Sequence, residues 1–134
     1  MIKKITLGIT LFFSTLMFAS PAYADWKWVA TNVGGTTAYV DFDRMRTNGG
    51  YVYFWQLVDF LKPDEAGYLS DKVYIQGDCE MFRYKYLSFS FYKQPMGEGS
   101  GNTDSTPDTE WTYPSPNRVA ETILKKVCDY AETL

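Results

Sequence analysis

Hydrophobic and polar residues alternate along much of the chain between residues 26 and 92, and this period of two is typical of half-buried β-strands. In Thr36–Phe42, for example, Ala38, Val40 and Phe42 share one face. Clusters rich in Gly, Asn, Asp and Pro separate the alternating segments and favour turns. The pattern predicts strands at Trp26–Thr31, Thr36–Phe42, Tyr51–Phe60, Ser70–Gln76 and Glu80–Tyr92, with a short edge strand at Trp111–Tyr113.

Two of the separating segments predict tight turns. Asn48–Gly50 tolerates positive φ and is expected to close a hairpin in front of Tyr51. Gly77 and Asp78 are expected to turn the chain after the preceding strand. Within Glu80–Tyr92 the aromatic residues change face halfway along, which predicts a β-bulge or a sharp twist.

The strongest strand signal is Tyr51–Phe60, which is rich in β-branched and aromatic residues and is bounded by turn residues. One of its faces is apolar except for Gln56, and a helix can cover that face. The other face carries Tyr51, Tyr53 and Trp55, and it must meet a second layer, a partner or water.

The C-terminal part predicts a polar loop followed by a helix. Gln94–Glu110 has almost no hydrophobic residue after Met96 and is expected to be a mobile surface loop. Ser115 is the expected N-cap, and Pro116 suits the first helical position. Hydrophobic residues then recur at helical spacing, namely Val119, Ala120, Ile123, Leu124, Val127, Cys128 and Ala131. We therefore expect an α+β fold, an antiparallel β-sheet of about five or six strands with one C-terminal helix packed on one face.

The N-terminal segment has the composition of a secretory signal peptide. Lys3 and Lys4 give a positive start, Ile5–Phe18 is a short apolar core, and Ala22–Ala24 places small residues three apart. The apolar core falls short of the roughly 20 residues that cross a bilayer. A removable export signal is therefore favoured over a membrane anchor.

Cleavage is expected between Ala24 and Asp25, which leaves residues 25–134 as a single mature domain. No cysteine lies near this junction, so a lipid anchor is not expected. We predict a periplasmic or secreted protein that does not span the membrane after signal removal.

The net charge and the two cysteines limit the expected partners and the expected compartment of the protein. Residues 1–24 hold two of the 13 basic residues and none of the 16 acidic ones, so the mature chain has a net charge of −5. Such a chain repels nucleic acid and anionic lipid, and neither is an expected partner. In an oxidising compartment the two cysteines, Cys79 and Cys128, are expected to form a disulfide that joins the helix to the sheet.

Taken in order along the chain, these segments resemble the surface-adhesin protein E family of bacterial envelope proteins. The segments that carry the resemblance are Tyr39–Asp43, Tyr51–Phe60, Ser70–Lys72, Asp78 with Cys79, Tyr92, Met96–Gly99, Trp111, Pro114 and Cys128. The resemblance implies a mostly antiparallel sheet, a C-terminal helix, a cysteine bridge and a homodimer.

The family includes an outer-membrane adhesin that binds host matrix proteins such as vitronectin and laminin. That adhesin is lipid-anchored through an N-terminal cysteine, which this sequence lacks. A soluble periplasmic protein is therefore the expected form of this chain, and no binding segment transfers residue by residue.

The sequence offers little catalytic chemistry. It contains no histidine, which excludes Ser-His-Asp and Cys-His catalysis and imidazole metal sites. We predict no catalytic residue, no cofactor and no metal. Two alternatives remain open: a carboxylate pair in which Asp41 meets Asp43, Asp59 or Asp78, and a calcium ion held by Glu98, Asp104, Asp108 and Glu110. Strand ends, turns and a solvated loop account better for these acids.

The aromatic residues favour a binding role. Tyr and Trp are enriched at the centres of protein interfaces. Tyr51, Tyr53 and Trp55 could form such an interface, extended by Trp26 or Trp28, although sheet residues of this kind are often simply core. We predict a non-enzymatic interaction module whose partner is a second copy, an envelope protein or a host matrix protein. The alternative is an inhibitor that inserts Met96–Glu110 into an enzyme, or a carboxylate-dependent hydrolase acting on cell-wall glycans.

Overall fold

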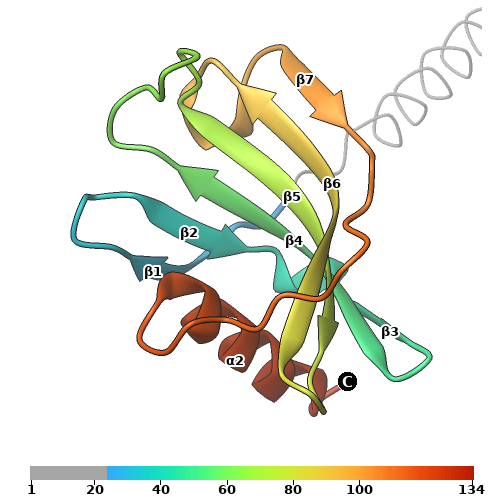
Figure 1. Cartoon of the computed structure of the whole chain (residues 1–134). Helices are drawn as coiled ribbons and strands as arrows, with labels where there is room; N and C mark the ends of the chain where they lie inside the picture. Colours follow the sequence, from blue (N-terminus) through green and yellow to red (C-terminus); the bar gives the residue numbers. More distant parts are fainter. Residues whose placement is uncertain (1–23) are drawn as a thin grey trace, which may run out of the picture.

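The computed structural model describes residues 24–134, so the predicted signal peptide lies outside the described residues except for Ala24. Figure 1 shows a sheet with one helix across its lower end. The elements are β1 (Lys27–Thr31), β2 (Thr37–Val40), η1 (Phe42–Arg44), β3 (Arg46–Asn48), β4 (Tyr51–Asp59), β5 (Ser70–Asp78), β6 (Arg83–Tyr92), η2 (Pro95–Gly97), β7 (Gly101–Asp104) and α2 (Val119–Ala131).

All the strands belong to one antiparallel sheet with the spatial order β1–β2–β4–β5–β6–β7, and β3 pairs with one end of β4. The predicted hairpin is present, because β3 and β4 pair through Asn48 and Tyr51, and Gly49 and Gly50 both adopt positive φ. The antiparallel sheet with one C-terminal helix confirms the predicted α+β fold.

The core lies between the sheet and α2. Its residues alternate along the strands as the sequence predicts, and the helix adds the stripe at three- and four-residue spacing. The buried hydrophobic cluster consists of Val29, Ala38, Val40, Met45, Val52, Phe54, Val73, Ile75, Ile123 and Val127. Trp28, in contrast, is 58% exposed at the outer strand β1.

The predicted bulge occurs in β6. Tyr74 pairs with Ser88 and the next residue, Ile75, pairs with Tyr86, so Leu87 is the extra residue on β6. This extra residue changes the phase of the strand, which explains why the aromatic residues of β6 switch faces.

The predicted end of β5 and the predicted starts of β6 and of the helix are wrong, and β6 begins at Arg83 rather than Glu80. Gly77 and Asp78 do not turn the chain but form the last two residues of β5, and the turn follows at Cys79–Phe82. The helix begins at Val119 with Arg118 as its N-cap, so Ser115 is not the cap. Asn117 has a φ of 61°, a left-handed conformation that a helix cannot include, and helical geometry therefore starts only after it.

The predicted mobile loop at Gln94–Glu110 is also wrong in part. Pro95–Gly97 forms the short helix η2, and Gly101–Asp104 forms β7, which extends the sheet beyond β6. The expected edge strand at Trp111–Tyr113 reduces to a single bridge between Tyr84 and Thr112.

The disulfide joins Cys79, in the turn between β5 and β6, to Cys128 on α2, with the two Cα atoms 5.6 Å apart. The bridge connects the helix to the sheet as predicted. No helix among residues 24–134 is long and apolar enough to cross a membrane.

Candidate functional site

The aromatic side chains of β4 lie on the sheet face opposite α2. Val52 and Phe54 are buried toward the helix, so the alternate residues Tyr51, Tyr53 and Trp55 project to the other side. All three are half-buried. They are therefore neither core residues nor isolated surface residues.

Two further aromatic residues extend this surface across neighbouring strands. The ring of Tyr74 on β5 lies 4.8 Å from that of Trp55 and 6.3 Å from that of Tyr53, measured between centroids. Trp111 packs 5.4 Å from Tyr51. The five rings lie on the side away from the helix, Tyr53, Trp55 and Tyr74 in one group and Tyr51 with Trp111 in another, and we call this surface the open face.

Cationic side chains border the open face. The guanidinium carbon of Arg83 lies 4.4 Å from the centroid of the Trp111 ring, and the Lys85 Nζ atom lies 4.7 Å from it. Cations at these distances are attracted to the electron-rich face of an indole. Arg83 also donates a hydrogen bond of 2.8 Å to the carboxylate of Asp78. Burial alone would raise the pKa of Asp78, but the bonds from Arg83 and the Met81 N–H outweigh it and hold the pKa below its usual value.

One row of residues crosses the open face from strand to strand. Arg46 on β3 pairs with Tyr53, Tyr53 pairs with Gln76 on β5, and Gln76 pairs with Lys85 on β6. Directly opposed residues in an antiparallel sheet point to the same side. The Gln76 amide donates to the Tyr53 hydroxyl at 3.2 Å, so the middle of the row is fixed and a cation stands at each end.

The segment around η2 covers the upper end of the same face. Leu57, which follows Trp55 on this side of β4, is fully buried. The Met96 N–H donates to the Asp59 carboxylate at 2.8 Å, and the Gly97 N–H donates to the Ser70 hydroxyl at 2.8 Å. The cover ends there, and the five aromatic rings remain partly exposed.

The structure does not bring the predicted carboxylates together. Asp41 is buried beyond the end of β2 beside Arg44, whereas Asp59 lies opposite Thr37 at the other end of that strand. Asp78 is held by Arg83 at the far end of β5. Each acid therefore has its own structural partner, and no pair flanks a common cleft. Asp43 is exposed on η1.

In the C-terminal segment, Asp104 and Asp108 likewise accept separate hydrogen bonds and do not form a common site. The Asp104 carboxylate accepts from the Thr106 N–H at 3.0 Å, and the Asp108 carboxylate accepts from the Tyr86 N–H at 3.0 Å. Within residues 24–134 no group of three or more His, Cys, Asp or Glu side chains is placed to hold a metal ion.

Sequence reasoning missed the buried Asp71. It lies on β5 between Val58 and Phe91, is 8% exposed, and its Oδ1 atom has no hydrogen-bond partner. Burial, and secondarily the nearby charge of Asp64, raises the pKa of Asp71 to about 7. The only sequence signal was an acid within an otherwise alternating strand.

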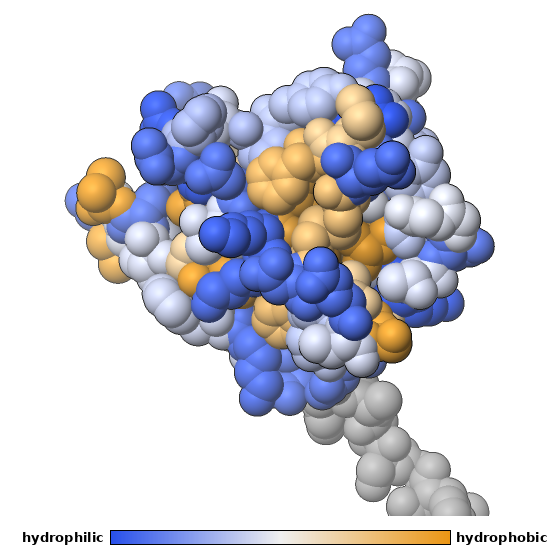
Figure 2. Space-filling model, turned by 90° about the horizontal axis from the view of Figure 1, so that it is seen from below, coloured by the Kyte–Doolittle hydropathy of each residue, from blue (hydrophilic) through white to orange (hydrophobic). Residues whose placement is uncertain are grey.

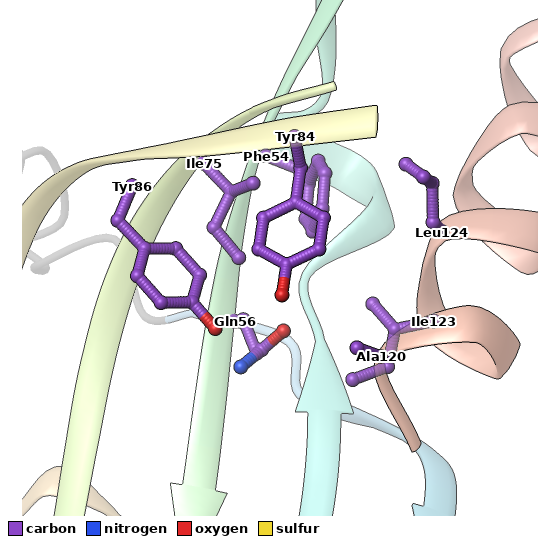
Figure 3. A pocket seen from close by; sticks show the side chains of 8 residues that line it. All are labelled: Phe54, Gln56, Ile75, Tyr84, Tyr86, Ala120, Ile123 and Leu124. Atoms are coloured by element: carbon purple, nitrogen blue, oxygen red, sulfur yellow. The ribbon is translucent and has the colours of Figure 1, made fainter. Parts of the chain in front are cut away.

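A small cavity under α2 holds polar groups as well. Figure 3 shows the hydroxyl groups of Tyr84 and Tyr86 and the amide of Gln56 directed toward it from the sheet, with Ile123 on the helix side. The cavity volume is about 10 Å³, enough for no more than one water molecule. Burial, with a contribution from Tyr84, raises the pKa of Tyr86. The cavity is part of the packing and is too small for a ligand.

A larger hollow of about 470 Å³ opens at the lower end of the molecule. Figure 2 shows hydrophobic side chains gathered at the centre of that end within a rim of polar ones. Its walls come from the β3–β4 hairpin, the β5–β6 turn and the end of α2, and they include Val52, Phe82 and both bridged cysteines. We assign it no ligand.

A sheet that is covered by a helix on one side and carries an aromatic surface on the other belongs to the class of small α+β domains. The model of one family, described as surface-adhesin protein E, matches residues 26–129. The chain therefore belongs to the surface-adhesin protein E family.

Solved structures of protein E from Haemophilus influenzae have the same fold. One crystal form has a TM-score of 0.61 at 15% identity, and the match covers 83% of this chain and 93% of that one. A second structure has a TM-score of 0.61 at 14% identity, with 85% and 92% covered. The structure from a non-typeable strain has a TM-score of 0.56 at 14% identity, with 84% and 82% covered. Among curated protein sequences no significant match is found.

Proposed function

We propose that this chain is an exported, non-enzymatic protein-binding module of the bacterial envelope and that it binds through the open face. The observation that carries the proposal is the half-exposed aromatic surface of Tyr51, Tyr53, Trp55, Tyr74 and Trp111. Such residues offer rigid contact area at a low entropic cost. The membership of an adhesin family supports the same role.

The proposed location is the periplasm or the exterior, after cleavage between Ala24 and Asp25. The bridge between Cys79 and Cys128 suits an oxidising compartment. The proposed partner is a host matrix protein, an envelope protein or a second copy of the chain. The alternative is an inhibitor that inserts Met96–Glu110 into an enzyme. It requires an ordered loop, and two backbone N–H groups of the first turn of this loop are bonded to side chains of the sheet.

The first test is binding to immobilised laminin and vitronectin by surface plasmon resonance. The protein is produced from the full chain and purified after export, alongside a Tyr53→Ser/Trp55→Ser variant. We expect the variant to bind at least about tenfold more weakly, because the centre of the contact surface is lost. Trp28→Ser is the matched control, since Trp28 is 58% exposed but lies at β1, with Lys126 of α2 5.9 Å from its ring.

The solution mass of the same proteins separates the classes of partner. A dimer in the parent and a folded monomer in the double variant would assign the open face to self-association. Equal binding of the parent and the double variant to both matrix proteins, with no change in mass, would contradict the proposed function. Circular dichroism of each variant verifies that it is folded.

A further inference from the structure

We infer that the open face binds an extended acidic segment of its protein partner, with carboxylates four residues apart reaching Arg46 and Lys85. The inference rests on the proposed function for the location of the surface and adds the chemistry of the partner. It starts from the row Arg46, Tyr53, Gln76 and Lys85, in which each residue opposes the next.

The spacing of the two cations follows from the sheet itself. Arg46 and Lys85 are separated by three inter-strand steps of about 4.8 Å, or roughly 14 Å in all. An extended peptide rises about 3.3 Å per residue, so side chains four residues apart lie roughly 13 Å apart and on the same side. The residue midway between them then faces Tyr53 and Gln76.

The charges of these two side chains are uncompensated. Within residues 24–134 neither Arg46 nor Lys85 has a carboxylate within 4.0 Å, whereas Arg83 is paired with Asp78. Two cations without a carboxylate partner thus stand at the ends of the row of Arg46, Tyr53, Gln76 and Lys85. A partner carboxylate at each end would compensate both charges.

A peptide fits this surface better than a densely sulfated glycan. Arg46 and Lys85 stand far apart with uncharged side chains between them, so closely spaced sulfates would find no cation over the middle of the row. The acidic remainder of the mature chain also repels a polyanion. In an acidic segment with a hydrophobic residue at its centre, the carboxylates would face the two cations and the central residue would face Tyr53 and Gln76.

The probe is a short fluorescent peptide with glutamates at its third and seventh positions and a tyrosine midway between them. A second peptide of the same composition has the two glutamates adjacent. Binding is measured by fluorescence anisotropy with the exported, purified protein and with Arg46→Glu, Lys85→Glu and Lys62→Glu. Lys62 is exposed in the β4–β5 loop, so Lys62→Glu makes the same change of charge away from the face.

We expect the spaced peptide to bind at least about tenfold more tightly than the adjacent one, and each change at Arg46 or Lys85 to remove that preference. If Lys62→Glu weakened binding of the spaced peptide as much as the changes at Arg46 and Lys85, the net charge of the protein would explain the effect and the inference would be overturned. Displacement of the peptide by a heparin fragment that binds more tightly, with the same dependence on Arg46 and Lys85, would assign the row to a glycan. If Tyr53→Ser/Trp55→Ser abolishes matrix-protein binding while Arg46→Glu and Lys85→Glu leave it intact, the proposed function holds and this inference fails.

An independent observation concerns the predicted cleavage junction. The backbone N atom of Asp25 lies 3.4 Å from Oδ2 of Asp41, and the Arg44 Nε atom lies 3.3 Å from the same oxygen. The Asp41 side chain is 1% exposed, and its Oδ1 atom has no hydrogen-bond partner. A buried carboxylate with one unpartnered oxygen is costly to keep in a fold.

We propose that signal removal supplies the missing partner of Asp41. Hydrolysis of the Ala24–Asp25 peptide bond consumes one water and leaves a carboxylate on Ala24 and an ammonium group on Asp25. The Asp25 nitrogen then carries three N–H donors and a positive charge in place of one amide N–H. It can bond both oxygens of Asp41, so the cleaved chain is more stable than the uncleaved one.

The test compares the form that begins at Asp25 with a form that keeps Ala24 and two added residues before it, each with and without Asp41→Asn. Mass spectrometry of the exported protein first locates the natural N-terminus. At about pH 6 we expect the extended form to have a Tm lower by roughly 4 °C or more, and Asp41→Asn to abolish this difference. Asp43→Asn, at an exposed carboxylate two residues away, is the control. A natural N-terminus elsewhere, or a difference that persists in Asp41→Asn, would refute the proposal.

Discussion

At the scale of single residues, alternation in the sequence places Tyr51, Tyr53 and Trp55 together on one side of β4. Their neighbours could not be predicted in the same way. The pairing of Tyr53 with Gln76, and of Gln76 with Lys85, depends on strand register, and register depends on where each turn falls and on the bulge in β6. The sequence therefore identified the centre of the candidate site but not its charged ends.

Asp71 gives a prediction for the dependence of stability on pH. Its pKa is about 7 in the fold and about 3.9 in an unfolded chain. Between these values the folded state binds more protons than the unfolded state, so the free energy of unfolding falls as pH rises from 4 to 7, by up to about 4 kcal/mol. Asp78, whose pKa is lowered, acts in the opposite direction and only below about pH 4.

Asp71→Asn removes this ionisation, and urea denaturation across the pH range measures the effect. We expect the variant to lose little stability between pH 4 and pH 7 and to be more stable than the parent at pH 8. Asp43→Asn, at an exposed acid, should keep the slope of the parent. An unchanged slope in Asp71→Asn would show that Asp71 does not titrate in this window.

At the scale of elements, two errors of sequence reasoning share one cause: local composition does not reveal distant strand pairing. Gly77 and Asp78 have turn-forming propensity, yet they end β5 because β6 continues to pair with both of them and β4 still pairs with Gly77. The polar residues of β7 likewise form a strand, because β6 offers them a free edge.

Gly77 is needed for the approach of the helix to the sheet. A Cβ atom at this position would lie 2.9 Å from Cγ1 of Val52 and 3.2 Å from Cδ1 of Leu124. We expect Gly77→Ala to destabilise the fold by about 1–3 kcal/mol, because the added methyl group separates α2 from β4. Gly34→Ala is the control, since the nearest atom there is the Asn32 side-chain oxygen at 3.4 Å. Equal urea midpoints for the two variants would refute the tight contact.

At the scale of the whole molecule, α2 is held to the sheet by the core and by one covalent bond. The sequence predicted the bond because the cysteines are the only two in the chain and the export signal implies an oxidising compartment. It did not predict that Cys79 lies in an exposed turn, since the end of β5 was misplaced.

Loss of the bridge between Cys79 and Cys128 should therefore be costly but should not abolish the fold. The two cysteines are 49 residues apart, and closing a loop of that length stabilises a protein by about 4 kcal/mol through the entropy of the unfolded chain. We expect Cys79→Ser/Cys128→Ser to lower the free energy of unfolding by about this amount in urea, and reduction of the parent to match it. Because the core residues of α2 remain, the far-ultraviolet circular dichroism should be retained in the absence of urea. A helix that melts on reduction would mean that the bridge, rather than Ile123, Leu124 and Val127, holds α2 against the sheet.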